Sequence, residues 1–314
     1  MTRRIPCAAL LCAALLSWPA PPAHGASAYA GEFLAVGAGA RGLALGSACV
    51  ALGDAATAGY WNSAGLAGSP ERQAHFTHGE RFNGLVRQDY VAFVTPGPYF
   101  DGLGIGLLRL GVDGIHFTDL PDPSAPLGPD NRPFVSSTES AADYALYLSG
   151  GRRLGERLDI GASAKLIHRS VADLTAYGGG LDLGLRYRPA PSLTLAANIR
   201  DVTTTPILWD GATDRILPSL LLGVAYGRAL AGGTASVAIG SRSGGDAEDE
   251  AGTAPVHAGI EYDAGRLALR AGLEEQRQTF GVGLRVRPRL QVDLAYLQHD
   301  DLEGTYLLSA DVRF

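Results

Sequence analysis

From about residue 72 onward, charged side chains of both signs share alternate positions with glycines, and apolar residues occupy the positions between them. In the stretch YGGGLDLGLRYRP, Asp182 and Arg186 share one side with glycines, while leucines and tyrosines occupy the other side. Arg270 and Glu274 in LALRAGLEE, and Arg285 in FGVGLRVRP, repeat this arrangement. Carboxylates and guanidinium groups on one face of a sheet can line a polar lumen. They can equally pair with one another and hold a wall rigid, because buried charges need partners whatever the function.

Groups that would support catalysis form no recognisable motif. The seven histidines are scattered, and neither HExxH nor GxSxG occurs. Of the three cysteines, only Cys49 lies beyond the first 28 residues, so neither an internal disulfide nor a structural zinc site is expected. Cys49 is expected to pack as a small buried side chain. We therefore predict a protein that is not an enzyme and that has no catalytic residue, metal or cofactor.

Charge and hydropathy exclude two further classes of protein. A net charge of −6 at pH 7 argues against a nucleic-acid partner, because nucleic acid is bound by basic faces. Apolar residues make up 46% of the 314 residues. Beyond the N-terminus, however, no run approaches the roughly 18 apolar residues of a spanning helix. A helical membrane protein is thus excluded, whereas an envelope protein built of strands is not.

The N-terminus has the three parts of a secretory signal peptide. Arg3 and Arg4 give a positive start, residues 5–16 (IPCAALLCAALL) form an apolar run, and APPAHGASA follows with small residues. The apolar run is too short to span a membrane as a helix. We predict a signal peptide over residues 1–28 and export of the remaining chain.

Alternation of apolar with small or charged residues continues to the C-terminus and predicts β-strands. Most segments are about ten residues long, which is the length of a tilted strand that crosses a bilayer. Fourteen segments follow the pattern, at 72–78, 89–95, 102–112, 141–150, 158–170, 175–188, 193–202, 218–229, 232–242, 255–263, 266–274, 278–288, 290–299 and 305–314.

The connectors between these segments indicate the class of fold. The long connectors, 113–140, 203–217 and 243–254, all fall at one end of the array, whereas the connectors at the other end are short. Outer-membrane barrels have short periplasmic turns and longer external loops, and a soluble barrel or propeller has no reason for this asymmetry. We predict an all-β fold, a 14-stranded antiparallel transmembrane β-barrel over residues 71–314. It would lie in the bacterial outer membrane, in contact with its lipid.

The last segment, YLLSADVRF, alternates without a fault to the final residue. In a closed barrel this strand must pair with the first, because an unpaired edge in lipid is too costly. Tyr306 and Phe314 fall on its apolar face. An outward aromatic at the last position resembles the C-terminal assembly signal of outer-membrane proteins, so we assign both residues to that signal and expect the barrel-assembly machinery as a partner. The alternative is a chance edge strand of a soluble sandwich.

Residues 29–70 break the alternation and are rich in glycine and alanine. GAGARG within them lacks the strand and helix that flank a nucleotide-binding loop, so that role is not assigned. The block GEFLAVGAGARGLALGSACVALGD, followed by YWNSAGLA, resembles the opening of the PorV/PorQ family, a branch of the FadL-like outer-membrane transporters. The matching positions are 33–34, 39–41, 54 and 61–66, with serine at 63 where the family usually has proline.

The resemblance implies that residues 29–70 form a hatch inside the barrel lumen. Physical reasoning supports a plug, because a 14-stranded barrel is too wide to be filled by the side chains of its own wall. Arg41, Asp54 and Asn62 of this segment would then meet charges of the lumen. The candidates on the wall are Asp182, Arg186, Arg270 and Arg285.

Three functions remain open on these grounds. The first is a FadL-like transporter that passes or binds hydrophobic or small organic solutes. The second is an outer-membrane accessory or cargo carrier without transport activity, which works with type IX secretion-system proteins. In that case the long connector 113–140, with DLPDPSAPLGPDNRP, could be an interaction surface. An envelope enzyme ranks last.

Overall fold

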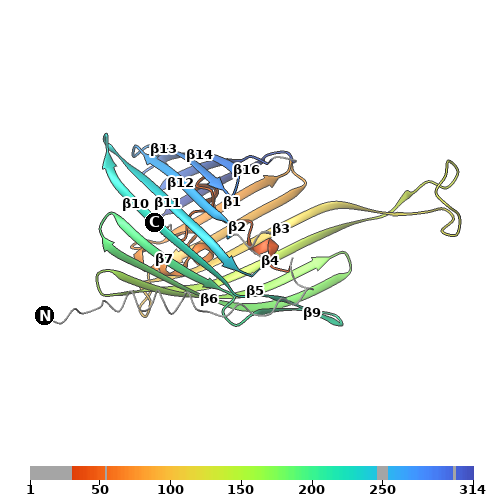
Figure 1. The fold of residues 1–314 in the computed structure, drawn as a ribbon, viewed down its shortest axis with the longest axis horizontal. Helices are drawn as coiled ribbons and strands as arrows, with labels where there is room; N and C mark the ends of the chain where they lie inside the picture. The colour runs from red at the N-terminus through yellow and green to blue at the C-terminus, as the bar shows by residue number, and fades with distance from the viewer. Residues whose placement is uncertain (1–29, 54, 246–253, 300–301) are drawn as a thin grey trace.

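The computed structural model describes residues 30–53, 55–245, 254–299 and 302–314 (Figure 1). No helix within these ranges is long and apolar enough to cross a membrane. The proposed signal peptide, residues 1–28, and the candidate lumen residue Asp54 lie outside the described residues.

The described strands form one antiparallel sheet, and fourteen of them close into a barrel. Closure comes from β1, which pairs with β16 over Gln73–Glu80 and with β2 on its other edge. The predicted 14-stranded barrel is therefore confirmed. Its strands are β1 (Gln73–Arg81), β2 (Val86–Thr95), β3 (Gly102–Asp119), β4 (Phe134–Leu154), β5 (Leu158–Val171), β6 (Leu174–Ala190), β7 (Leu193–Arg200), β10 (Ser219–Leu230), β11 (Gly233–Gly244), β12 (Val256–Asp263), β13 (Leu267–Glu274), β14 (Arg277–Arg287), β15 (Leu290–Leu297) and β16 (Thr305–Arg313).

Two of the long connectors contain structure that the sequence pattern did not predict. Within 203–217, β8 (Thr205–Trp209) and β9 (Ala212–Ile216) form a hairpin that pairs with the end of β6. Within 113–140, β3 and β4 continue as a paired ribbon that projects far beyond the barrel (Figure 1). Both features lie at the end of the barrel opposite the short turns.

Side chains alternate between the two faces of the wall. On β16, Tyr306 and Leu308 are 64% and 46% exposed on the outer face, whereas Leu307 and Ser309 are each 1% exposed on the inner face. The other barrel strands likewise carry exposed leucine, valine, isoleucine or phenylalanine on the outer face. A closed wall without a free edge and with an apolar outer face is suited to lipid on all sides. The chain is a protein of the bacterial outer membrane.

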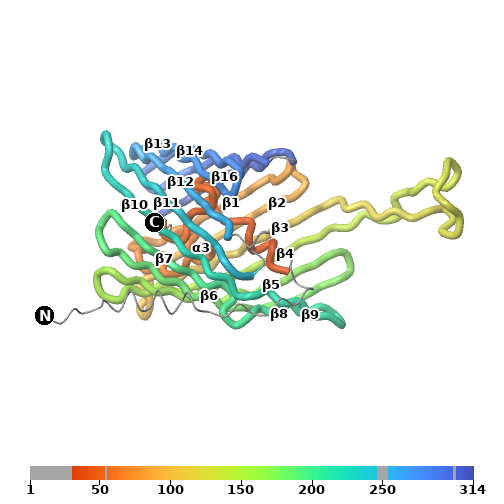
Figure 2. Tube along the Cα trace, viewed as in Figure 1, coloured from red at the N-terminus to blue at the C-terminus, as the bar shows by residue number. Residues whose placement is uncertain are grey.

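The N-terminal segment, residues 30–69, consists of short helical turns that lie among the strands (Figure 2). They are η1 (Glu32–Leu34), α2 (Ala40–Ala44), α3 (Ala58–Trp61) and η2 (Ser63–Gly68). Helix α2 contacts β13 to β16, whereas η2 contacts β3 to β6, so the segment reaches opposite parts of the wall.

Candidate functional site in the barrel lumen

Glycines on the inner face of the wall let the backbone of the N-terminal segment approach closely. A Cβ atom on Gly161 of β5 would overlap the backbone of Ser63 and Ala64. A Cβ on Gly272 of β13 would overlap the backbone at Leu45 and Gly46. No side-chain rotation can relieve an overlap with backbone atoms. These inward glycines thus form seats for the segment, which gives a physical reason for glycine on the charged face of the strands.

The seats occur on β3 to β6 and on β10 to β14. Inward glycines whose added Cβ would fall within 4 Å of the N-terminal segment are Gly102, Gly104, Gly151, Gly161, Gly184, Gly223, Gly240, Gly259, Gly272 and Gly281.

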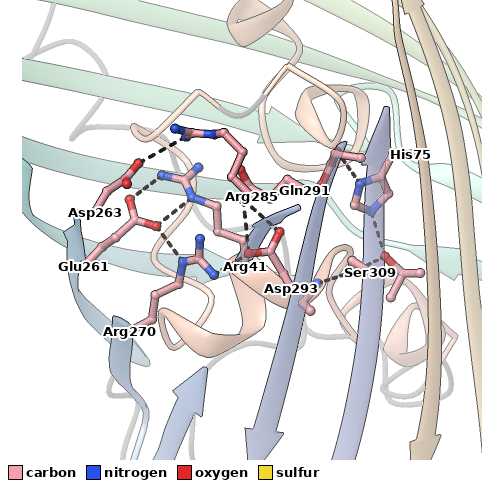
Figure 3. A network of polar contacts seen from close by, with 12 residues as sticks. Arg41, His75, Glu261, Asp263, Arg270, Arg285, Gln291, Asp293 and Ser309 are labelled. Atoms are coloured by element: carbon pink, nitrogen blue, oxygen red, sulfur yellow. Dashed lines mark hydrogen bonds and ion pairs between the residues drawn. The ribbon is translucent and has the colours of Figure 1, made fainter. Parts of the chain in front are cut away.

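Arg41 joins the segment to an ion-pair network on β12, β13 and β15 (Figure 3). Its Nε and Nη2 donate to the two carboxylate oxygens of Glu261 at 2.9 and 2.8 Å. Arg270 Nε donates to Glu261 at 2.6 Å, and its Nη1 donates to Asp293 at 2.6 Å. Gln291 also donates to Asp293. Two arginines and two carboxylates thus alternate, and each charge has a partner of opposite sign.

Asn62 fixes the other end of the segment to the wall through all its polar atoms. Its Nδ2 lies 3.1 Å from the carbonyl oxygen of Val50, and 3.3 Å from those of Leu185 on β6 and Ala197 on β7. Its Oδ1 accepts a hydrogen bond of 3.1 Å from the N–H of Ala64, which caps η2. The residue is 3% exposed. Asn62 therefore links two parts of the segment to two strands.

Asp182 belongs to a second buried network, which contains residues that the sequence analysis missed. Lys165 Nζ lies 2.9 Å from Asp182 and 2.8 Å from Asp201, and the lysine is 2% exposed. Asp182 also accepts the backbone N–H of Asp201 at 2.8 Å. Lys165 is the single lysine of the chain. Its position on the inner face of β5 could have identified it as a candidate from the sequence.

The remaining candidates differ in how closely they approach the segment. Arg186 on β6 is buried, and a Cβ on Gly53 would overlap its guanidinium group. Its Nε has no hydrogen-bond partner among the described residues. Arg285 has its partners on the wall: they are Asp263 at 3.6 Å and the carbonyl oxygen of Gly265, both at the β12–β13 turn (Figure 3).

The two residues of the predicted assembly signal lie on the outer face. Tyr306 and Phe314 are 64% and 52% exposed. The Tyr306 ring lies 5.1 Å from that of Tyr296, and the Phe314 ring lies 6.0 Å from that of Phe93. The backbone N–H of Phe314 also donates to the carbonyl of Arg72, which extends the pairing with β1.

Aromatic and aliphatic side chains fill the lumen beside the segment. Tyr60 donates a hydrogen bond to the carbonyl of Leu34 at 2.7 Å and makes edge-to-face contacts with the rings of Tyr90 and Tyr147. Ile207 and Ile216 of the β8–β9 hairpin belong to the same buried cluster. The hairpin therefore packs against the segment, a contact that could not be predicted from the sequence.

Little empty space remains within the segment itself. A cavity of about 10 Å³ is lined by residues that include Arg41, Cys49, Trp61 and Asn62. Such a volume holds about one water molecule. Within the described part of the chain, no group of three or more His, Cys, Asp or Glu side chains is arranged to hold a metal ion.

Comparison with solved structures finds barrels of similar fold. The CymD monoaromatic hydrocarbon channel aligns with a TM-score of 0.59 and 14% identity, over 89% of this chain and 98% of that chain. The toluene transporter TbuX of Ralstonia pickettii gives 0.57 and 14%, over 88% and 98%. The toluene transporter TodX of P. putida gives 0.56 and 15%, over 86% and 98%. No protein-family model and no curated protein matches the sequence. The chain thus shares the barrel fold of these solved structures.

Proposed function

We propose that the protein is an outer-membrane channel for hydrophobic small solutes, with residues 29–70 acting as a hatch in the lumen. The observation that carries the proposal is the seating of the N-terminal segment on inward glycines of a barrel whose fold is shared with hydrocarbon channels. CymD is a monoaromatic hydrocarbon channel, and TbuX and TodX are toluene transporters. Monoaromatic hydrocarbons are therefore the solutes to test first. The motif at 33–66 supports a place in the PorV/PorQ branch.

The composition of the lumen supports an apolar solute. The β8–β9 hairpin and the rings around Tyr60 belong to one buried apolar cluster. Rings of this kind offer an aromatic hydrocarbon both apolar area and edge-to-face contacts. The cavity of about 10 Å³ is too small for such a solute. Passage therefore requires the segment to shift away from its glycine seats, and the ion pairs of Arg41 limit that shift.

Uptake by cells tests the proposal. A Gram-negative host that lacks its own hydrocarbon channels would express the full-length protein or a variant without residues 29–70. We expect the full-length protein to raise the initial rate of uptake of labelled toluene over a vector control. In planar bilayers the deletion should raise the single-channel conductance, because the lumen left behind is wide enough for water. Toluene uptake equal to that of the vector control would refute a toluene channel, and an unchanged conductance would refute the hatch.

The second candidate is an accessory or carrier protein of a type IX secretion system that transports no solute. The observation that favours it is the close packing of the lumen, because a carrier needs a stable barrel rather than a passage. In this case the full-length protein would not raise toluene uptake over the vector control and would co-purify with type IX components. Measuring uptake and co-purification on the full-length protein separates the two candidates.

A further inference from the structure

The hairpin ribbon of β3 and β4 has no role in closing the barrel. β2 pairs with β3 only as far as Gly111, and β5 pairs with β4 only from Ala141 onward. Beyond these points, residues 113–119 and 134–140, here called the arm strands, pair as strands only with each other. At the base of the arm, the carbonyl of Ser140 accepts the N–H of Ala172 and Asp113 pairs with Arg87. Beyond this base, each arm strand therefore presents an unpaired row of backbone N–H and C=O groups on its outer edge. Such an edge is a template for another strand.

The arm also exposes large apolar side chains to solvent. Phe117, Phe134 and Val135 are 48%, 51% and 52% exposed on the arm strands, and Leu127 at the tip is 71% exposed. The arm projects away from the barrel, beyond the wall that faces lipid (Figure 1). These side chains are therefore not covered by the bilayer. Exposed apolar residues beside a free strand edge are typical of a surface that binds a protein.

The tip of the arm is held in one conformation. Asn131 Nδ2 donates to the carbonyl oxygens of Asp122, Ala125 and Pro126 at 2.9, 3.0 and 3.2 Å, and its Oδ1 accepts the N–H of Asp122. Five prolines, at 121, 123, 126, 129 and 133, restrict the backbone of the same connection. The tip lies beyond the barrel wall (Figure 1), so its order does not help the barrel to fold. A binding surface gains affinity, because less conformational entropy is lost on binding.

The charge of the arm indicates the partner. Residues 113–140 contain five carboxylates and one arginine, which gives a net charge of −4 with histidine neutral. The carboxylates are Asp113, Asp119, Asp122, Asp130 and Glu139. Hydrogen bonds from the hydroxyl and the N–H of Ser124 lower the pKa of Asp122 below its ordinary value, so this group stays ionised at neutral pH. Two such arms repel each other, which disfavours a second copy of this chain as the partner.

We propose that the arm is a docking site for a basic, extended segment of another exported protein, which adds as a strand to an arm edge. Backbone hydrogen bonds to the edge would give affinity, and the arm carboxylates would select lysine or arginine on the incoming strand. This role is independent of solute passage through the lumen. A failure to transport toluene would therefore not contradict the docking site.

Synthetic peptides presented to the full-length protein in nanodiscs test the proposal by biolayer interferometry. The probe is a short peptide of alternating lysine and valine. One control peptide replaces lysine with glutamate, and another replaces alternate valines with proline, which cannot complete a backbone ladder. We expect the lysine peptide to bind at least about tenfold more tightly than either control, and to weaken as salt is raised. Equal binding of the proline peptide would overturn strand addition.

Matched variants of the protein locate the binding. Asp113→Asn, Asp119→Asn, Asp130→Asn and Glu139→Gln together remove four charges from the arm, while Asp122 is kept because it orders the tip. The control removes four charges from another connector with Asp246→Asn, Glu248→Gln, Asp249→Asn and Glu250→Gln. We expect the arm variant to lose at least about tenfold in affinity and the control to lose less than about twofold.

A third variant removes the arm by joining Val112 to Ala141 through a two-residue turn, and should bind the peptide no better than an empty nanodisc. Heat-modifiable migration checks that each variant has folded. Equal losses in the arm variant and the control, undiminished binding without the arm, or arm-dependent dimers of the unliganded protein would each overturn the proposal.

Discussion

Arg41 and Glu261 lie 220 positions apart in the sequence and are joined by two hydrogen bonds, of 2.9 and 2.8 Å. Arg41 belongs to the N-terminal segment and Glu261 to the wall strand β12. Glu261 also accepts a hydrogen bond from Arg270, so that one carboxylate serves two guanidinium groups. The pair is therefore not symmetric: loss of Arg41 leaves Glu261 with Arg270, whereas loss of the Glu261 carboxylate removes a partner from both guanidinium groups.

This asymmetry predicts unequal costs for two substitutions. Glu261→Gln leaves two guanidinium groups without their shared anion and should lower the free energy of unfolding by roughly 3–5 kcal/mol. Arg41→Gln leaves Glu261 paired with Arg270 and should cost roughly 1–3 kcal/mol. Urea unfolding in lipid vesicles measures both, and the double variant should depart from additivity by about 0.5–3 kcal/mol. Additive losses would show that the two residues are not coupled.

The inward glycines lead to a second prediction. Gly161→Ala places a methyl group against the backbone of Ser63 and Ala64 and should cost about 1–3 kcal/mol through overpacking. The N-terminal segment should become more sensitive to added protease, while the barrel still migrates as a folded species. Gly227→Ala is the control, because the added Cβ would meet only Ser236 Oγ, at 3.3 Å, and a carbonyl at 4.0 Å. Equal protease sensitivity in both variants would contradict the seat at Gly161.

The barrel was predictable from the sequence because alternation is a local property. Each strand shows which residues face lipid without knowledge of its neighbours, as in Tyr306 to Phe314. The β8–β9 hairpin was not predicted because its strands are only five residues long, and Pro206 and Gly211 interrupt the alternation. The arm strands were not predicted because register shifts after Val112 and Phe117 break the alternation.

The lumen was predictable only in part. The inner face of each strand was visible, so Arg270 and Asp182 could be named as candidates. Their partners depend on strand register and on the path of the N-terminal segment, and neither can be read from spacing. Lys165 and Asp201 meet only because β5, β6 and β7 are neighbours in the closed wall. Arg285 faces inward as expected, yet its partners are Asp263 and Gly265 of the wall, near a short turn.

The assembly signal gives a third prediction. Removal of Phe314 should reduce the amount of folded protein in the outer membrane, because it takes away the terminal aromatic and its backbone hydrogen bond to Arg72. Leu308→Ala is a suitable control, since Leu308 is 46% exposed on the same face of the same strand. Leu307 would be a poor control, because it is buried in a cluster that contains residues of the N-terminal segment. Membrane yield is measured by heat-modifiable migration after fractionation. Equal yields of the two variants would show that Phe314 is not part of the assembly signal.

Lys165 provides the sharpest test of the buried charges. Its ammonium group lies between Asp182 and Asp201 at 2.9 and 2.8 Å. Lys165→Met keeps much of the side-chain volume and leaves two carboxylates facing each other, which should cost roughly 3–5 kcal/mol in vesicle unfolding. Arg87→Met is the control, because both partners of its ion pair with Asp113 are about half exposed, at 55% and 51%, and such a pair contributes about 0–1 kcal/mol.

A compensating variant then shows whether charge is the cause of the Lys165→Met loss. Adding Asp182→Asn and Asp201→Asn to Lys165→Met removes all three charges and should recover part of the stability, because a neutral buried cluster avoids the uncompensated carboxylates. If the triple variant is no more stable than Lys165→Met alone, the lysine contributes through packing of its aliphatic chain. In that case charge pairing does not hold this part of the wall.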